Sequence, residues 1–277
     1  MADAALEAAR LQWQFADAEL IADTATSRVY KGTLADGTAA ALKLLKPYGA
    51  DEIEGVRLLQ WLDGNGAARI LGIQGLMILM EWLDGPPLGD MVRIDRDDDG
   101  ATAILSGALR QLQRPRTNPP PLRSLREQFN ALFATQPDEW PASHRPLVAR
   151  AVDLATGLFS TTAAEIPLHG DFHHDNVVRG ARGWQVIDPK GLIGDPHYEP
   201  ANVFRNPYGA AEIARRPERI ERTANALAAD GRLDRRRLLA WATVHSAISA
   251  CWDRGAGNAV DWDLTMMPLL FAALDRA

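Results

Sequence analysis

Cysteine is almost absent from this chain: among its 277 residues only Cys251 carries a thiol. A single cysteine excludes an internal disulfide framework and a cysteine-rich zinc site. Long apolar runs are missing too, since no stretch approaches the ~20 apolar residues that a membrane-spanning helix needs. The first residues include Asp3 and Glu7 where a signal peptide would have its apolar core. We therefore expect a cytoplasmic protein that does not enter a membrane.

An excess of positive charge is also missing, because thirty basic residues face thirty-six acidic ones and the formal net charge is −6. A negative body repels a phosphate backbone, which argues against a nucleic-acid binder without a separate basic patch. The same sign favours a nucleotide bound through Mg²⁺, or a cationic small molecule. We expect a small-molecule partner, cationic or polyhydroxylated, with no nucleic acid, no membrane and no obligate protein partner.

The first third of the chain has the pattern of an antiparallel sheet with one helix. Asp36-Gly37 and Gln74-Gly75 are tight hairpin signals, and residues 51–62 have the 3.6-residue apolar spacing of an amphipathic helix. Tight turns join neighbouring strands in antiparallel fashion. The strands are predicted at 11–15, 27–34, 38–45, 69–73 and 76–83.

Beyond residues 84–87 (Asp-Gly-Pro-Pro) the pattern becomes helical. The acidic run at 97–99 is interpreted as a solvated loop. We predict an α+β fold of two lobes: a small antiparallel lobe at 1–83, and a larger, mainly helical lobe at 84–277. The helices are predicted at 88–94, 101–113, 122–134 and 143–163, and from about 199 to the end.

Ionisable side chains crowd into residues 168–196, between two short apolar pieces. Strand ends that carry carboxylates often present catalytic groups. One chemistry that fits is phosphoryl transfer, with Asn176 and Asp188 as oxygen ligands of Mg²⁺. The other is a two-metal phosphohydrolase that uses the histidines and aspartates together. The cluster contains His169, Asp171, His173, His174, Asp175, Asn176 and Asp188.

The string H-G-D-F-H-H-D-N followed by V-I-D resembles the catalytic loop and metal-binding aspartate of aminoglycoside phosphotransferases, which have the protein-kinase-like fold. The longer string, through I-D-P-K-G-L-I-G-D-P and A-N-V-F-R-N-P, is similar to the aminoglycoside/hydroxyurea antibiotic resistance kinases, the branch that contains the streptomycin 6-phosphotransferases. The resemblance implies transfer of a phosphoryl group from ATP with Mg²⁺ to a hydroxyl of a streptomycin-like aminoglycoside. Hydroxyurea and a non-antibiotic metabolite remain alternative acceptors.

The resemblance also implies roles in the catalytic loop. Asp171 corresponds to the catalytic base, and Asn176 and Asp188 to the ligands of Mg²⁺. His169 would fix the shape of the loop. His173, with its neighbour, stands where protein kinases have a lysine beside the base, which argues against a protein substrate.

On the nucleotide side, Lys43 matches the lysine that neutralises the α- and β-phosphates. Glu54 fits the carboxylate that pairs with this lysine, and Glu52 is the alternative. No G-x-G-x-x-G is present, so Ser27, in the segment that covers the phosphates, is the expected phosphate contact. The backbone groups of Glu81 and Leu83 would form the hinge that binds adenine.

A streptomycin-like acceptor carries guanidinium groups, which carboxylates and an aromatic wall would bind. Asp195, Glu199, Tyr198 and Trp252 are the candidates for that surface. Lys190, two residues beyond the metal aspartate, is expected to contact the transferred phosphate or the acidic groups beside it.

Overall fold

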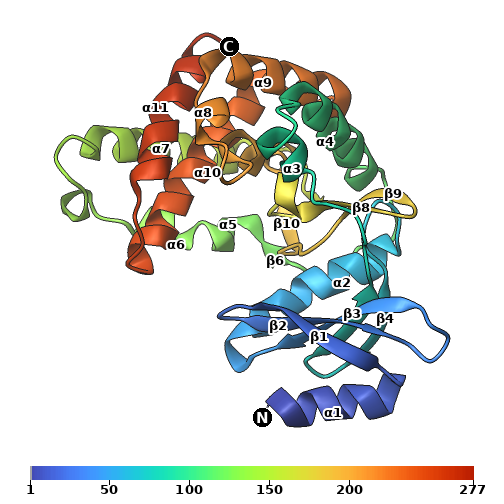
Figure 1. The fold of residues 1–277 in the computed structure, drawn as a ribbon. Coiled ribbons are helices and arrows are strands. Elements are labelled where there is room, and N and C mark those ends of the chain that lie inside the picture. Colours follow the sequence, from blue (N-terminus) through green and yellow to red (C-terminus); the bar gives the residue numbers. More distant parts are fainter. Residues whose placement is uncertain (1) are drawn as a thin grey trace.

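The computed structural model describes residues 2–277, without the side chains of residues 2, 3, 50 and 51. Its N-terminal part is a five-stranded sheet in the order β1-β2-β3-β5-β4, and every pair of neighbours is antiparallel (Figure 1). The strands are β1 (Ala16–Asp23), β2 (Ser27–Thr33), β3 (Ala39–Leu45), β4 (Ile70–Gln74) and β5 (Met77–Glu81). Both predicted hairpins are present.

A helix precedes the sheet, α1 (Ala2–Trp13), so the prediction of a strand at 11–15 was wrong. Ala9 and Trp13, one helical turn apart, pack on the outer face of the sheet against Leu42 and Leu79. Gly72 allows this approach, because a Cβ there would lie 2.7 Å from Nε1 of Trp13. An alternation over five residues does not distinguish a strand from the end of an amphipathic helix.

The other face of the sheet is covered by η1 (Pro47–Glu52) and α2 (Ile53–Leu62), which agree with the predicted helix at 51–62. In Figure 1 α2 lies between the sheet and the helical part of the chain. Gly55 of α2 is in close contact with Pro189, since a Cβ at Gly55 would lie 1.9 Å from the Pro189 carbonyl oxygen. At Gly191 (φ +69°) a Cβ would lie 2.4 Å from the backbone of Glu54. Glycine at both positions therefore lets α2 rest directly on the D-P-K-G segment.

The helical part begins beyond Glu81, and residues 84–87 run along β8: Gly85 N–H donates to the carbonyl of Arg179, and Leu88 N–H to that of Val177. The boundary at residues 83–84 stays a prediction. The α-helices are α3 (Gly89–Arg93), α4 (Asp98–Leu112), α5 (Leu125–Gln128), α6 (Asn130–Ala134), α7 (Arg145–Ser160), α8 (Ala211–Ala214), α9 (Pro217–Gly231), α10 (Arg235–Gly255) and α11 (Asp261–Asp275).

Short strands and 3-10 turns connect these helices. One small sheet has the order β6-β10-β7, and β8 pairs with β9 in a hairpin. The strands are β6 (Arg123–Ser124), β7 (Ile166–Leu168), β8 (Val177–Gly180), β9 (Gly183–Val186) and β10 (Leu192–Gly194); the turns are η2 (Pro137–Glu139), η3 (His174–Asn176), η4 (Pro196–Tyr198) and η5 (Ala201–Arg205).

Two predictions in this part were wrong. Residues 122–134 are not one helix, because Ser124 is extended and caps a new helix by accepting from the N–H of Arg126, and Phe129 separates α5 from α6. The acidic run is not a solvated loop: Asp97 caps α4, and Asp98 is buried in an ion pair with Arg219. Among residues 2–277 no helix is long and apolar enough to cross a bilayer.

Candidate active site

The loop between β7 and η3 contains the predicted catalytic groups. His169 is the first residue of this loop, and its side chain fixes the loop through two hydrogen bonds. The His169 side chain is buried, with Nε2 2.8 Å from the carbonyl oxygen of Ile187, while Nδ1 accepts from the N–H of Asp171. Burial lowers the pKa of His169 to about 4, so the ring is neutral at physiological pH. A neutral ring that donates through Nε2 and accepts through Nδ1 satisfies both contacts. The His169 side chain therefore links the catalytic loop to the segment that precedes Asp188.

Asp171 lies in this loop, and a quarter of its side chain is exposed. One carboxylate oxygen accepts a hydrogen bond from Nδ2 of Asn202 at 2.8 Å. Nε2 of His173 and Nζ of Lys190 are each 3.8 Å from the carboxylate. Burial alone would raise the pKa of Asp171, but the neighbouring His173, Lys190 and His169 outweigh it, and the pKa is lowered. Asp171 is thus an ionised acceptor held in one orientation.

Asn202 was missed by the sequence reasoning, although it stands in the string A-N-V-F-R-N-P. Its side-chain oxygen accepts from Nδ2 of Asn206, and that side chain also donates to the Asn202 backbone carbonyl, each at 2.9 Å. An asparagine thirty-one residues beyond an aspartate gives no local signal of contact. The fold brings them together because η5 packs beneath the catalytic loop.

Asn176, one of the two predicted metal ligands, is hydrogen-bonded to the backbone on both sides of the site. Nδ2 of Asn176 donates to the carbonyl of Asp171 at 2.9 Å, and the N–H of Ile187 donates to the carbonyl of Asn176. The amide hydrogens of Asn176 face Asp171, which leaves Oδ1 for another partner. Half of the Asp188 side chain is exposed. Two hard oxygen ligands at this position fit Mg²⁺.

Lys43 on β3 links the sheet to Asp188. Its Nζ lies 2.5 Å from Oδ1 of Asp188 and 2.5 Å from Oε2 of Glu52. Burial opposes the charge of Lys43, yet the two carboxylates more than compensate, and the pKa of Lys43 is raised. The prediction that Glu54 pairs with this lysine was wrong, because Glu54 forms an ion pair with Arg57 instead. η1 brings its last residue, Glu52, to Lys43, directly before α2 begins at Ile53.

The other predicted nucleotide contacts lie around the sheet. The Ser27 side chain is 4% exposed, and its hydroxyl lies 3.4 Å from that of Thr24, so a direct phosphate contact by Ser27 disagrees with its burial. The N–H of Glu81 donates to the carbonyl of Arg69. Since its N–H is used in this bond, only the backbone carbonyl of Glu81 could bind adenine. Leu83 follows β5 in an irregular segment.

The two-metal alternative is contradicted by where the histidines lie. Among residues 2–277 no group of three or more histidine, cysteine or carboxylate side chains could hold a metal ion. His169 is engaged with Ile187, and His174 is fully buried 3.5 Å from Arg219. His169, His173 and His174 lie within six consecutive positions, but their rings occupy separate environments. They therefore do not form a shared ligand set.

Comparison with known proteins gives the family. The family described as "Aminoglycoside/hydroxyurea antibiotic resistance kinase" matches residues 12–257. The chain belongs to this family. The chain is also similar to a streptomycin 3''-kinase of Klebsiella pneumoniae, 37% identical over 214 residues that cover 75% of this chain and 77% of the relative. A hydroxyurea phosphotransferase of Kitasatospora aureofaciens is 34% identical over 238 residues, covering 82% and 66%.

Solved structures agree on the fold. The aminoglycoside phosphotransferase APH(4)-Ia superposes with a TM-score of 0.68 at 15% identity, covering 98% of each chain. The protein-kinase-like fold predicted from the motifs is confirmed. The kinase is a phosphotransferase that acts on a hydroxyl group of a small molecule.

Three of the predicted acceptor contacts of this family member are internal to the protein, so their assignment to the acceptor surface was wrong. Glu199 is buried and accepts from the N–H groups of His169 and Gly170 at 2.7 and 3.1 Å. Burial raises the pKa of Glu199 to about 7, against the effect of these two bonds. Glu199 therefore holds the catalytic loop from beneath.

Asp195 and Tyr198 are also buried, each 2% exposed. Asp195 caps η4 by accepting from the N–H of His197, and it pairs with Arg237. These hydrogen bonds lower the pKa of Asp195 despite its burial. The Tyr198 hydroxyl lies 2.9 Å from Nδ1 of His245. The D-P-H-Y-E segment thus ties the catalytic loop to α10.

Trp252 and Lys190 have side chains that are only partly buried. The Trp252 ring packs edge-on against His245 with centroids 6.2 Å apart. Lys190 lies over Asp171, and its N–H donates to the His169 carbonyl at 2.7 Å. Of the five residues predicted for the acceptor side, these two keep surface that a ligand could reach.

Buried His245 makes stability depend on pH in a predictable direction. Burial and the nearby Arg205 lower its pKa to about 3, from the ordinary 6.5. In the unfolded chain the ring protonates near pH 6.5, whereas in the folded protein it stays neutral. The free energy of unfolding therefore decreases as the pH falls below 6.5. Between pH 7.5 and 5 this loss is about 2 kcal/mol at 1.36 kcal/mol per pK unit.

We expect the His245→Gln variant to lack this loss. Urea unfolding at several pH values should show that the wild-type free energy of unfolding, minus that of the variant, falls by about 2 kcal/mol from pH 7.5 to 5. All other titrating groups are shared by the two proteins and cancel. A difference that stays constant over this range would contradict the buried neutral histidine.

Proposed function

We propose that this kinase transfers the γ-phosphoryl group of ATP, with Mg²⁺, to a hydroxyl of a streptomycin-like aminoglycoside. The observation that carries the proposal is the convergence of Lys43, Asp188 and Asp171 from three separate parts of the chain. Lys43 touches Asp188 at 2.5 Å, and Lys190 lies 3.8 Å from Asp171. In-line phosphoryl transfer requires a cation for the phosphates, a metal ligand and a base for the acceptor hydroxyl. Lys43, Asp188 and Asp171 match these three requirements in turn.

Each group then has a defined task. Asp171 accepts the proton of the attacking hydroxyl, and Asn202 keeps its carboxylate oriented. Lys43 would bind the phosphates of the nucleotide, where its positive charge compensates theirs. Asn176 Oδ1 and Asp188 would hold Mg²⁺, which neutralises charge on the phosphates when it is bound. Lys190 lies where it can compensate charge on the transferred group.

The acceptor is proposed from similarity and charge together. Two relatives are a streptomycin 3''-kinase and a hydroxyurea phosphotransferase. The net charge of −6 favours the cationic compound over the neutral one. We therefore propose streptomycin as the acceptor and hydroxyurea as the compound to compare with it.

The assay is ADP release from Mg-ATP in the presence of streptomycin, hydroxyurea or glycerol. We expect stimulation by streptomycin and none by the other two. Stimulation by hydroxyurea alone would move the proposal to that acceptor and overturn the antibiotic assignment. If the protein binds nucleotide but none of the three compounds stimulates ADP release, the proposed acceptor is wrong and the kinase acts on a different compound.

Glu52 and Glu54 provide a matched pair for the nucleotide half of the site. Glu52→Gln removes the charge that faces Lys43, and a hydrogen bond to a charged group contributes about 1.5–3 kcal/mol. We expect the Kd for Mg-ATP in calorimetry to rise about tenfold to a hundredfold. Glu54→Gln, two residues on and paired only with Arg57, should leave it nearly unchanged. The reverse result would assign the lysine partner to Glu54.

A further inference from the structure

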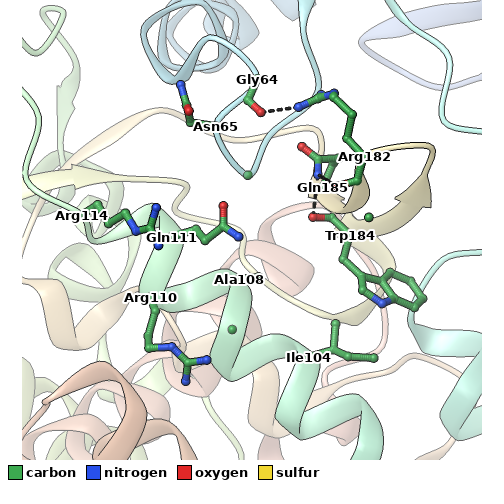
Figure 2. Close-up of a pocket in the computed structure, with 13 residues that line it drawn as sticks. Gly64, Asn65, Ile104, Ala108, Arg110, Gln111, Arg114, Arg182, Trp184 and Gln185 are labelled. Carbon is green, nitrogen blue, oxygen red and sulfur yellow. Dashed lines mark hydrogen bonds between the residues drawn. The ribbon is translucent and has the colours of Figure 1, made fainter.

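A cavity of about 530 Å³ lies outside the proposed active site (Figure 2). One wall is the face of α4 formed by residues 104, 107, 108 and 111, which follow one another at helical spacing. The second wall is the loop after α2, at residues 64–66, and the third is the β8–β9 turn with the start of β9, at residues 182–185. The volume lies within the range of small-molecule sites, about 300–1,000 Å³. None of the residues that the proposed chemistry uses lines this cavity.

The charged residues that line the cavity are all basic. Of the thirteen residues around the cavity, three are the arginines Arg110, Arg114 and Arg182, and none is acidic. This contrasts with a chain whose net charge is −6. Carboxylates outside the lining neutralise two of the three: Asp230 pairs with Arg110 at 2.8 Å, and Glu81 pairs with Arg182.

Arg114 has no carboxylate partner among the side chains that the structure describes. Its charge contributes, after burial, to a lowered pKa of Arg116. Arg116 in turn donates to backbone carbonyls, among them those of Leu112 and Gln111. Arg114, in the lining itself, therefore favours an anion at this edge of the cavity.

A buried acceptor also faces this site. The Gln185 side chain is 4% exposed, and its amide nitrogen donates to the carbonyls of Arg182 and Trp184 at 3.3 and 2.9 Å. Both amide hydrogens are thereby used, so the orientation of the amide is fixed. Its Oε1 has no hydrogen-bond partner among the described residues. In Figure 2 this amide and that of Gln111 border the open space from opposite sides.

From these observations we propose that the cavity between α4, the 64–66 loop and the β8–β9 turn binds a small phosphate ester that carries hydroxyl groups. The phosphate pairs with Arg114, since guanidinium groups bind phosphate oxygens in a bidentate manner. A hydroxyl of the ligand donates to Oε1 of Gln185. The wall at the β8–β9 turn is preformed, because Arg182 also donates to the carbonyls of Gly64 and Ala67.

Two variants test the site without disturbing the core. Arg114→Gln removes the free charge from an exposed side chain. Gly107→Phe fills the space, because a Cβ at Gly107 meets no atom closer than Nη2 of Arg110 at 3.8 Å, and glycine in a helix is replaced without backbone strain. Arg215→Gln, at an exposed arginine outside the cavity, is the matched control.

Calorimetric titrations with glucose 6-phosphate, inorganic phosphate and glucose, in the absence of ATP, measure binding. We expect glucose 6-phosphate to bind more tightly than phosphate, and glucose not to bind. Arg114→Gln should weaken glucose 6-phosphate binding about tenfold or more, the effect of losing a charged hydrogen bond. Gly107→Phe should also weaken it, because the ring occupies the space of the ligand, while Arg215→Gln should bind as wild type. Equal affinity in all four proteins, or no binding to the wild type, would overturn the proposal. Equal affinity for phosphate and its ester would overturn the role of Gln185.

Discussion

Replacing Asp171 with asparagine is expected to lower kcat by about 10²–10⁴, the usual contribution of a general base. Neighbouring His173 and Lys190 keep the pKa of Asp171 below its ordinary value against the effect of burial, so the carboxylate is ionised at neutral pH. Asparagine has the same size and can still accept from Asn202. It cannot take the proton of the acceptor hydroxyl. ADP release at saturating substrates measures the effect.

Asp175 offers a control in the same loop. Its side chain is 28% exposed, close to the 25% of Asp171, but it pairs with Arg93. Asp175→Asn should therefore change kcat by no more than a few-fold. If both variants lost activity equally, the loss would reflect damage to the loop. If Asp171→Asn kept more than a tenth of the activity, the assignment of the base would be wrong.

The largest expected loss of stability is at Asp98. The Arg219 side chain is completely buried, and its Nε lies 3.2 Å from both carboxylate oxygens of Asp98. In Asp98→Ala this guanidinium loses its counter-charge inside the protein. Breaking a buried pair in this way costs about 3–5 kcal/mol. Urea unfolding followed by far-ultraviolet circular dichroism should show this decrease in the free energy of unfolding.

The adjacent residue is the matched control for Asp98. The Asp99 side chain is 80% exposed and pairs with Arg222, whose side chain is 55% exposed. Asp99→Ala should change the free energy of unfolding by no more than about 0.5 kcal/mol. Similar losses in the two variants would show that the whole acidic run acts through solvent-exposed charge. A small loss at Asp98 alone would contradict the buried ion pair.

Arg219 also connects this stability to the active site. Its guanidinium donates to the backbone carbonyls of Phe204 and Asn206 at 3.0 and 2.9 Å. The same short segment contains Asn202, which orients Asp171. A buried charge pair between α4 and α9 thus holds the segment beneath the catalytic base.

Elements with local signals could be predicted from the sequence. The hairpins at Asp36-Gly37 and Gln74-Gly75 follow from turn chemistry, and the helix at 51–62 from its apolar spacing. The catalytic loop was found because its chemistry-bearing residues lie within eight consecutive positions. Where the signal was ambiguous, as at 11–15, packing of α1 on the sheet decided the outcome.

The contact partners of individual side chains could not be predicted in this way. Glu52 and Glu54 are two residues apart and of the same type, and only the 3-10 turn before α2 determines which one reaches Lys43. Asp195 and Glu199 are carboxylates in a polar string, a pattern equally typical of a binding surface and of buried caps. Burial distinguished the two, and burial depends on what packs over the segment.

The sequence by itself determined the family, the two-part α+β architecture and the residue types of the catalytic loop, because these depend on patterns within short stretches of chain. Only the tertiary structure decided that Asn202 orients Asp171, that Glu199 holds the loop from beneath, and that a basic cavity lies behind the β8–β9 turn. Each of these contacts joins residues about thirty or more positions apart. Their distances depend on how helices and sheet pack, which no local pattern records.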